Sequence, residues 1–397
     1  MIIKEKLIPN QSLITNSSLG FSDENYPTTS DDLDVLLDRI HKVSNERQQD
    51  FETLSKKNKD IVGKYISAIE KKKKNQILDE DEYFLKGQEL LKSKRISDKD
   101  FFRFLIYRYN YSAIPAMYKL EEYPPCVQIE PTSICNYRCV MCYQADKTFS
   151  GKSQGMMGHM PIDLFKKIVD ELEGKVEAVT LASRGEPTLN PKIIEMVEYC
   201  KGKFLGFKMN TNASLLTEKL IHSLLSAGFS EIVFSIDAAD KETYEKIRIN
   251  GKFDKVFSNL KLFTEIRKKH YSHMDTIVKV SGVKINSDLN VKSLEDKLGE
   301  YADIIQLVGY TPWESSYENP TNEITSPCGQ LWHRMFVWWD GKVNPCDYDY
   351  KSKLSKWNVK TQSISEIWKS DEYQNYRNLH ISKKRQELFP CNKCSFT

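Results

Sequence analysis

The chain has 397 residues, of which 40% are hydrophobic and 11% aromatic, which is enough apolar material for two or three globular domains. Its 58 basic and 55 acidic residues leave a formal net charge of +3, which excludes any charge argument for a nucleic-acid or anionic-membrane partner. The first residues lack the apolar stretch of a signal peptide, and no run of about 18 apolar residues follows them. We therefore expect a soluble, cytoplasmic protein whose nine cysteines serve as metal ligands rather than as disulfides.

The first part of the chain has the pattern of a helical extension. Residues from about 30 to 110 combine helical periodicity with many charges, and Ser30 stands as an N-cap before two aspartates. This pattern predicts a helical N-terminal extension over residues 1–120. A lysine run at residues 71–74 is either a contact for an acidic partner or a solvated helix end, and solvated ends are the commoner case.

The middle of the chain alternates short apolar runs with amphipathic stretches, from residue 121 to residue 312. The runs cover residues 126–132, 177–183, 204–210, 231–237, 276–285 and 303–310, and amphipathic stretches lie between them at 161–174, 191–202, 217–228 and 253–269. Six strands with intervening helices predict an α/β fold with a parallel sheet and right-handed crossovers. Ligands of such folds gather at the carboxyl ends of the strands.

Three cysteines follow the first predicted strand at Cys-x3-Cys-x2-Cys spacing: Cys135, Cys139 and Cys142. Three thiolates in one loop leave one corner of a four-iron four-sulfur cluster without a protein ligand, so that a small molecule can bind the open iron. A zinc site is the alternative, but zinc sites usually close with four ligands in paired Cys-x2-Cys knuckles. The spacing therefore indicates an enzyme.

The triplet and Tyr143, directly after its last cysteine, resemble the signature of the radical S-adenosylmethionine (radical SAM) superfamily. The resemblance implies a partial (β/α)6 barrel with a [4Fe-4S] cluster on the three cysteines. In this family the open iron is chelated by the amino and carboxylate groups of SAM. Reductive cleavage of SAM then yields a 5′-deoxyadenosyl radical that abstracts hydrogen from the substrate. The resemblance also implies an electron donor of the flavodoxin or ferredoxin type.

Two later strand ends match further parts of the family pattern. Gly185, Glu186 and Pro187 resemble a motif whose carboxylate accepts hydrogen bonds from the SAM ammonium and whose glycine allows close backbone approach. The third strand ends at Asn210 and is followed by Asn212, and both amides are candidates for hydrogen bonds to substrate or ribose.

The end of the fourth strand and the helix after it add three candidates. Ser235 and Asp237 match the family's polar, ribose-facing pair. Arg248 is similar to an arginine that many relatives use for the SAM carboxylate, which its planar fork suits. A surface ion pair with Glu245 is an equally good interpretation of Arg248.

Four cysteines mark the last region, residues 313–397: Cys328, Cys346, Cys391 and Cys394. Between them, residues 335–346 have the pattern of a hairpin around Asp340-Gly341, a favoured type I′ turn. Residues 363–380 predict a helix with Ser363 and Glu366 as a capping box. The layout resembles the twitch domain, the shortened relative of the SPASM domain, and implies one auxiliary [4Fe-4S] cluster. A structural zinc would accept the same four ligands.

The expected reaction depends on that auxiliary cluster. A cluster with four protein thiolates cannot easily bind substrate, but it can accept an electron from a substrate radical. The resemblance thus implies a two-electron oxidation of a small polar, sugar- or cyclitol-like substrate. A peptide-modifying maturase of the SPASM type and a non-catalytic iron-sulfur or zinc binding module are the alternatives. No residue of the sequence identifies itself as the proton acceptor.

Overall fold

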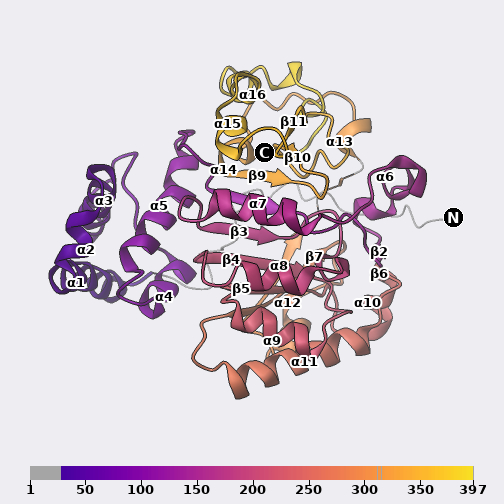
Figure 1. Ribbon diagram of the computed structural model, residues 1–397, viewed down its shortest axis with the longest axis horizontal. Helices are drawn as coiled ribbons and strands as arrows, with labels where there is room; N and C mark the ends of the chain where they lie inside the picture. The colour runs from indigo at the N-terminus through magenta and orange to yellow at the C-terminus, as the bar shows by residue number, and fades with distance from the viewer. Residues whose placement is uncertain (1–27, 311, 314, 397) are drawn as a thin grey trace. The chain divides into compact units, whose positions relative to one another are not determined.

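The computed structural model describes residues 28–396 apart from Thr311 and Glu314, and Figure 1 shows its ribbon. The described residues form two compact units, one up to Glu121 and one from Glu122 onward. Within these residues, none of the helices has both the length and the apolar content of a membrane span.

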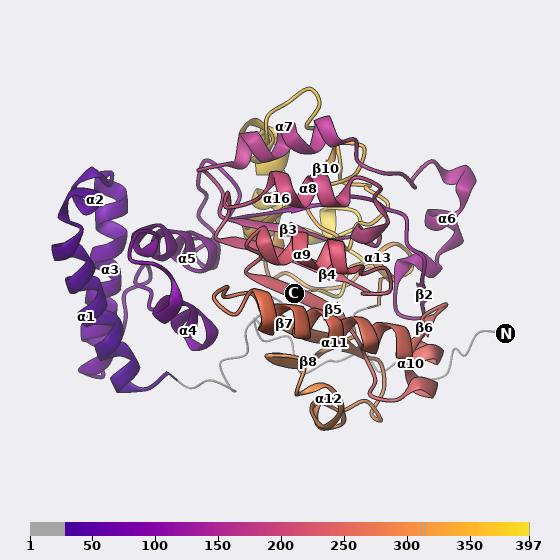
Figure 2. The ribbon, with the colours of Figure 1, turned by 60° about the horizontal axis from the view of Figure 1, so that its bottom comes forward.

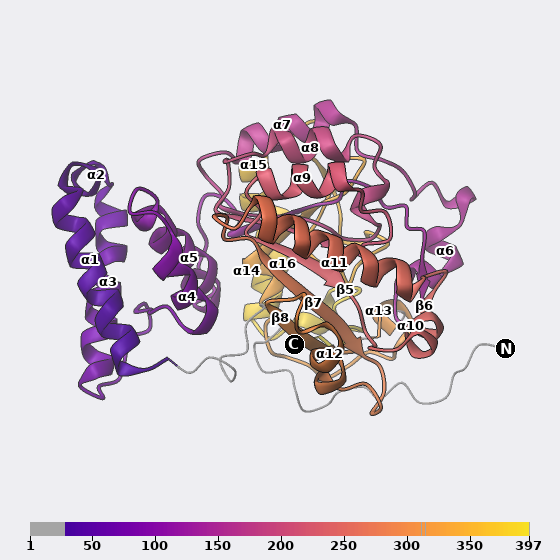
Figure 3. The ribbon, with the colours of Figure 1, turned by 90° about the horizontal axis from the view of Figure 1, so that it is seen from below.

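The described residues of the first unit form helices, as predicted for residues 1–120; residues 1–27 of that prediction lie outside the described residues. The helices are α1 (Ser30–Glu46), α2 (Gln48–Thr53), α3 (Lys56–Lys73), α4 (Gly87–Arg95) and α5 (Phe101–Ala116). Buried side chains at Leu33, Leu36, Ile40 and Val43 recur every three or four residues and form one stripe along α1. Helices α1 and α3 lie side by side (Figures 1 and 3), so that the stripe packs inside the unit.

The N-cap of α1 differs from the prediction. Thr29 caps the helix, and Ser30 is its first helical residue. The Thr29 hydroxyl accepts a hydrogen bond from the Asp32 amide, and the Asp32 carboxylate accepts one from the Thr29 amide. The reciprocal capping box selects Thr29 over Ser30, because Thr29 has Asp32 three residues ahead and Ser30 has Leu33.

Two lysines of the run at residues 71–74 neither wait for an acidic partner nor form a simple solvated helix end, because they pair within their own unit. Lys71, at the end of α3, pairs with Asp79 at 2.7 Å and with Glu82 at 2.9 Å, and Lys73 pairs with Asp34. These two ammonium groups thus stabilise their own unit.

The second unit is built on an open, mostly parallel sheet, and the prediction of six parallel strands is confirmed. These strands are β1 (Cys126–Ile129), β3 (Ala178–Leu181), β4 (Gly206–Thr211), β5 (Glu231–Ser235), β7 (Ile277–Lys284) and β8 (Ile304–Gly309), in that order across the sheet. The C-terminal region extends the same sheet. Strand β9 (Arg334–Val337) runs parallel to β1, and β10 (Lys342–Asn344) and β11 (Trp357–Asn358) follow in antiparallel order.

Four helices cover one face of this sheet: α7 (Ile162–Leu172), α8 (Ile193–Tyr199), α9 (Glu218–Ser226) and α11 (Phe253–His270). They lie side by side in all three views (Figures 1, 2 and 3). Apolar strand residues such as Val127, Val179 and Ile232 are buried at alternate positions, as the pleat requires. Their neighbours, among them Gln128, Thr180, Lys208 and Glu231, share the opposite face through direct pairing across the sheet.

Short elements complete the unit. The strands β2 (Arg138–Cys139) and β6 (Arg248–Ile249) pair in a separate small sheet. The remaining helices are α6 (Lys147–Ser150), α10 (Lys241–Ile247), α12 (Val291–Leu298), α13 (Ser315–Glu318), α14 (Gln330–His333), α15 (Ile364–Lys369) and α16 (Asp371–Ile381). Single 3-10 turns lie at Tyr143–Ala145, Lys152–Gln154, Pro187–Leu189 and Arg385–Glu387.

The predicted C-terminal hairpin is confirmed, but the predicted type I′ turn is wrong. Val337 pairs with Val343, and the Trp338 amide donates to the Lys342 carbonyl at 2.9 Å, so three residues form the loop. Of the two central residues predicted for a type I′ turn, only Gly341 has a positive φ, of +84°. A three-residue loop needs one left-handed position, which glycine adopts without strain.

The predicted helix over residues 363–380 begins with the expected capping box of Ser363 and Glu366. It is divided at Ser370, whose ψ of 147° is extended and separates α15 from α16.

A buried ion pair ties the ends of two strands to the hairpin. Glu130 follows β1 and Arg184 follows β3, and both side chains are almost fully buried. The guanidinium donates from Nε to one carboxylate oxygen at 2.8 Å and from Nη2 to the other at 2.7 Å. The carboxylate also accepts the Trp339 amide at 3.2 Å, and Arg184 Nη1 donates to the Tyr350 carbonyl at 3.0 Å.

We expect Arg184→Met to lower the free energy of unfolding by about 3–5 kcal/mol, because it leaves the Glu130 carboxylate buried without its cation. The measurement is urea unfolding of the metal-free protein, followed by tryptophan fluorescence. The double variant Glu130→Gln/Arg184→Met should recover most of the loss, because no buried charge remains. Lys166→Met is the control, since it removes a partly exposed pair with Glu195 that is worth about 1 kcal/mol or less. Equal losses in Arg184→Met and Lys166→Met would contradict the expectation.

Candidate functional site

The cysteine triplet lies in the loop and short strand that follow β1. Each of its sulfur atoms accepts a hydrogen bond from an N–H group. The Tyr137 amide lies 3.4 Å from Cys135 Sγ, the Gln144 amide 3.5 Å from Cys142 Sγ, and Arg248 Nη1 3.8 Å from Cys139 Sγ. Donors of this kind stabilise the thiolate, which is the form that binds metal.

The three thiols lie close enough to act on one another. The pKa of Cys135 is raised to about 12, mainly by burial and then by Glu186, Cys142 and Cys139. Burial also raises the pKa of Cys142 to about 12, with Cys139 adding to the effect. The structure thus brings the three predicted ligands together and places Glu186 beside them, and a bound cation would have to displace the thiol protons.

The loop with Gly185 and Glu186 packs directly on the start of the cysteine loop. A Cβ atom on Gly185 would lie 2.3 Å from the Thr132 carbonyl oxygen and 2.6 Å from that of Ile134. The Glu186 amide donates to the Ile134 carbonyl at 2.9 Å. Only glycine permits this approach, which is the role that the sequence predicted for it.

The Glu186 carboxylate is 3% exposed and is held by protein donors. Its Oε1 accepts the hydroxyls of Thr188 and Thr211, each at 2.7 Å, and its Oε2 accepts the Asn212 amide at 2.6 Å. Burial raises the pKa of Glu186, although these hydrogen bonds oppose the shift. With one hydrogen-bond donor, Oε2 keeps acceptor capacity for a cation such as an ammonium group.

The two predicted asparagines differ in their surroundings. Asn212 is buried, and its amide donates to Asn136 Oδ1, in the cysteine loop, at 2.9 Å. Asn210 is exposed on the polar face of β4. Asn210 is therefore the one of the two whose side chain is open to a ligand.

Asp237 and Arg248 form a buried pair with each other. Arg248 donates from Nε to Oδ2 at 2.6 Å and from Nη2 to Oδ1 at 3.1 Å. Asp237 also accepts the Val283 amide at 2.7 Å. The alternative interpretation of Arg248, a surface ion pair with Glu245, is therefore wrong. Glu245 pairs with Lys252 at 3.2 Å instead.

Ser235 ends β5, where it is half-buried and lies opposite Ser281 of β7. Pro187 opens a 3-10 turn directly after Glu186 and is buried.

Tyr143 packs between the cysteine loop and the C-terminal region. Its ring stacks on Tyr350 with centroids 4.8 Å apart and meets Phe149 edge-on at 5.6 Å. Its hydroxyl donates to the Ser183 carbonyl at 3.1 Å. The side chain thus joins the two cysteine regions.

The four C-terminal cysteines line one cavity: Cys328 before α14, Cys346 after β10, and Cys391 and Cys394 near the end of the chain. Burial raises the pKa of Cys328 to about 11, and Cys394 adds to it. Burial likewise raises the pKa of Cys346, followed by Asp347 and Cys328. The other two cysteines, Cys126 and Cys200, are each 1% exposed in the core, as predicted.

Both sets of thiols fit an iron-sulfur ligand by their chemistry and their grouping. In the described part of the chain, no three His, Cys, Asp or Glu side chains are spaced to hold one metal ion. Which inorganic group the thiols bind stays a prediction.

Sequence reasoning missed several residues at these sites. Glu130 and Arg184 brace both loops, and the Gln144 side chain donates to the Ser133 carbonyl at 2.7 Å and also to that of Arg184. Arg385 and His380 line the four-cysteine cavity. The one available signal was the position of Arg184 directly before the Gly-Glu-Pro motif.

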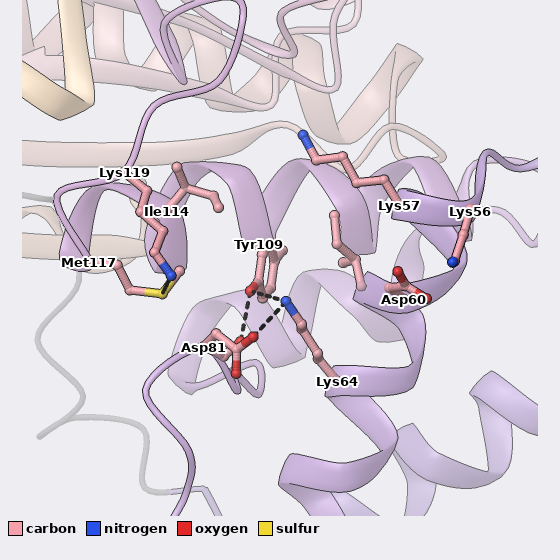
Figure 4. Close-up of a pocket in the computed structure, with 10 residues that line it drawn as sticks. Lys56, Lys57, Asp60, Lys64, Asp81, Tyr109, Ile114, Met117 and Lys119 are labelled. Carbon is pink, nitrogen blue, oxygen red and sulfur yellow. Dashed lines mark hydrogen bonds and ion pairs between the residues drawn. The ribbon is translucent and has the colours of Figure 1, made fainter.

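A second concave site lies within the helical unit (Figure 4). It has a volume of about 330 Å³, within the range of small-ligand pockets. Lys64 points at Asp81 and Tyr109, with its Nζ 2.8 Å and 3.2 Å from their oxygen atoms. The charged residues of its lining are Lys56, Lys57, Asp60, Lys64, Asp81 and Lys119. The excess of lysines suits an anionic group.

Family comparisons agree with this geometry. A model of the radical SAM superfamily matches residues 129–288, and a model of an iron-sulfur cluster-binding domain, SPASM, matches residues 328–395. The first match contains the three-cysteine site and the second contains the four-cysteine site. Residues 129–288 thus form a radical SAM domain, and residues 328–395 form a SPASM iron-sulfur cluster-binding domain.

Individual relatives cover only part of the chain. An uncharacterized protein of Methanocaldococcus jannaschii is 28% identical over 48% of this chain and 60% of its own length. The mycofactocin maturase MftC of Mycobacterium tuberculosis is 28% identical over 38% of this chain and 40% of its own length. The structure of Streptococcus suis SuiB bound to the precursor peptide SuiA has a TM-score of 0.51 at 14% identity, covering 71% of this chain and 72% of SuiB. This likeness is one of fold.

We expect Gly185→Ala to lose most of the iron bound at the triplet, because its methyl group cannot fit 2.3 Å from the Thr132 carbonyl. The measurement is iron content after anaerobic reconstitution of a variant in which Cys328 and Cys346 are alanine, so that only the triplet can bind. Gly63→Ala is the matched control, because a Cβ there meets no atom within 4 Å. Full iron content in Gly185→Ala would show that the two loops can separate without cost.

Proposed function

We propose that this chain cleaves SAM reductively and uses the resulting 5′-deoxyadenosyl radical to abstract hydrogen from a polar substrate in an overall two-electron oxidation. The observation that carries the proposal is the grouping of Cys135, Cys139, Cys142 and Glu186 at the carboxyl ends of β1 and β3. When bound, a [4Fe-4S] cluster on the three thiolates supplies the electron that breaks the SAM sulfonium bond.

The chain's own residues would bind and orient SAM around that cluster. Glu186 Oε2 is the proposed acceptor for the SAM ammonium, because it is buried and has only one protein hydrogen-bond donor. Asn210 and Ser235 are the proposed polar contacts for ribose or substrate. Asp237 holds Arg248 beside Cys139, and the guanidinium N–H groups that Asp237 does not use are the proposed donors to the SAM carboxylate.

We further propose one auxiliary [4Fe-4S] cluster on Cys328, Cys346, Cys391 and Cys394. Their common cavity supports this count, and so does the burial of Cys126 and Cys200 in the core. The electron balance gives the cluster a role. One substrate electron leaves with the abstracted hydrogen atom, and a second must leave as the substrate hydroxyl loses its proton. The auxiliary cluster is the proposed acceptor of that second electron.

The polar face of the sheet supports a hydrophilic substrate, such as a sugar or cyclitol. Lys208 and Glu231 pair across it at 2.7 Å, and Gln306 donates to Ser281 at 3.2 Å. Hydroxyl groups can exchange hydrogen bonds with the donors and acceptors that these side chains do not use for each other, whereas an apolar substrate would leave those groups unpaired at a cost of about 1–3 kcal/mol each.

A peptide substrate is the second candidate. It is supported by the SuiB fold, solved with a precursor peptide, and by the partial similarity to the maturase MftC. The lysine-lined pocket of the helical unit (Figure 4) would suit an acidic segment of such a peptide. A non-catalytic binding module fits less well, because the triplet and Glu186 are intact. An electron donor of the flavodoxin or ferredoxin type would complete the system in the cytoplasm.

We expect about eight irons per chain after anaerobic reconstitution, from two four-iron clusters, and release of 5′-deoxyadenosine from SAM with a strong reductant. Cys328→Ala/Cys346→Ala should retain about four irons, and Cys135→Ala should abolish 5′-deoxyadenosine release. Cys200→Ala is the control and should change neither, because Cys200 lies in the core. Full iron content without SAM cleavage would favour the binding module.

We expect Asn210→Ala to leave the iron content unchanged. It should raise the KM for SAM or for the substrate about tenfold, because the loss of one hydrogen bond costs about 1.4 kcal/mol. Asn378→Ala, on the exposed side of α16, is the matched control. A higher KM for SAM would put Asn210 at the cofactor. If a fraction of cell extract stimulates 5′-deoxyadenosine release by the wild type and stimulates Asn210→Ala less, Asn210 contacts the substrate. Testing small-molecule and peptide fractions separately would identify the substrate class. Wild-type kinetics in both assays would contradict a contact at Asn210.

A further inference from the structure

The wall of the four-cysteine cavity holds a buried cation whose hydrogen bonds are incomplete. Arg385 lines this cavity and is 1% exposed. Its Nε donates to the Cys391 carbonyl at 3.2 Å, and its Nη2 donates to the carbonyls of Cys394 and Phe396 at 3.0 and 2.6 Å. Nη1 has no hydrogen-bond partner in the described part of the chain. A guanidinium has five N–H groups, so two remain unused.

A histidine on the same wall adds a third unused N–H group. His380 lines the cavity and is 0% exposed. Its Nδ1 accepts the Cys328 amide at 3.1 Å, while its Nε2 has no partner among the described residues. Because a backbone amide can only donate, Nδ1 must be unprotonated, and the ring proton is on Nε2.

Buried donors are rarely left unpaired, because each costs about 1–3 kcal/mol. Sulfur atoms of a cluster bound by the surrounding thiolates would supply the missing acceptors. On the basis of the auxiliary cluster proposed above, we infer that Arg385 and His380 donate hydrogen bonds to that cluster and raise its reduction potential. Reduction adds negative charge, and a fixed cation and N–H donors at the sulfur atoms favour the reduced state.

The two cysteine sites differ in how their arginines are balanced. Beside the triplet, Arg248 is neutralised by Asp237 through two hydrogen bonds. At the four-cysteine site, Arg385 donates to backbone carbonyls and lies against the Cys394 thiol, and the described residues offer it no carboxylate within ion-pair distance. A carboxylate therefore balances the charge of Arg248 at the triplet, whereas no carboxylate of the described residues balances the charge of Arg385 at the four-cysteine site. This difference favours electron transfer from substrate toward the auxiliary cluster.

Two carboxylates face the same site and act in the opposite sense. Asp349 lines the cavity, but it accepts hydrogen bonds from the Tyr317 hydroxyl at 2.8 Å and from the Lys353 and Leu354 amides at 2.9 and 2.7 Å. These donors offset its charge. Asp347 follows Cys346 directly, and its negative charge acts on Cys346, Cys328 and Cys394. The Arg385 charge opposes it at Cys328 and Cys394 and also acts on Cys391.

The test is the midpoint potential of the auxiliary cluster, measured by EPR-monitored redox titration in a variant with Cys135, Cys139 and Cys142 replaced by alanine. Iron and zinc are quantified first. Zinc in place of iron would contradict the auxiliary cluster itself and, with it, this inference. A loaded cluster whose potential is the same in all variants would overturn only the inference.

Paired substitutions separate the donor role from a merely structural one. His380→Asn keeps an acceptor for the Cys328 amide and removes the Nε2 donor, whereas His380→Gln keeps a donor near the Nε2 position. Arg385→Gln removes the charge, whereas Arg385→Lys retains it. We expect His380→Asn and Arg385→Gln to shift the potential to more negative values, with at least a tenfold change in the reduction equilibrium for Arg385→Gln, or 59 mV for one electron. The paired variants should shift it less.

Arg385 also braces the segment that carries Cys391 and Cys394, so its variants can fail to bind iron. A second measurement on the unsubstituted side chains covers that case. Pulsed EPR of the reduced cluster, in protein labelled with 15N-arginine or 15N-histidine, should detect nitrogen couplings from these side chains. The absence of both couplings would overturn the inference.

Discussion

The buried pair of Glu130 and Arg184 is the interaction on which the rest of the second unit depends. It joins the end of β1 to the end of β3, and through Trp339 and Tyr350 it reaches the C-terminal hairpin. A buried charge without its partner costs several kcal/mol, so these segments keep one arrangement relative to one another. The cysteine loop follows Glu130, and the Gly-Glu-Pro motif follows Arg184. One ion pair therefore positions the segment with the cysteine triplet and the hairpin that leads to the four-cysteine site.

The shared sheet gives this connection its stiffness. Strand β9 extends the sheet beyond β1 in parallel register, with Val127 opposite Met335, so the SPASM segment is a continuation of the core rather than a separate module. Tyr143 stacks on Tyr350 across the same junction. A change in either cysteine region would be felt in the other through packed side chains, because closely packed interiors transmit strain.

The electrostatics of the two sites complement this geometry. Each site places an arginine beside its thiols, but Asp237 balances only Arg248. Backbone carbonyls hold Arg385, and carbonyl dipoles cannot cancel a full charge. The polar face of the sheet adds the charged pair of Lys208 and Glu231. The triplet thus has a charge-balanced arginine beside it, and the four-cysteine cavity has an arginine without a carboxylate partner among the described residues, a difference that the proposed oxidation would use.

The sequence by itself determined the features that depend on local spacing. The cysteine triplet, the order of six parallel strands, the N-terminal helices and the Ser363 capping box all follow from patterns within a few residues. Contacts between distant segments were decided only by the tertiary structure. Arg248 lies 109 residues from Cys139, which it contacts, and nothing near it in sequence marks Asp237 as its partner. The parallel pairing of β9 with β1 and the placing of Arg385 and His380 in one cavity wall belong to the same class. Local propensity and spacing carry short-range order, whereas burial and the need to pair buried polar groups act only once the chain has folded.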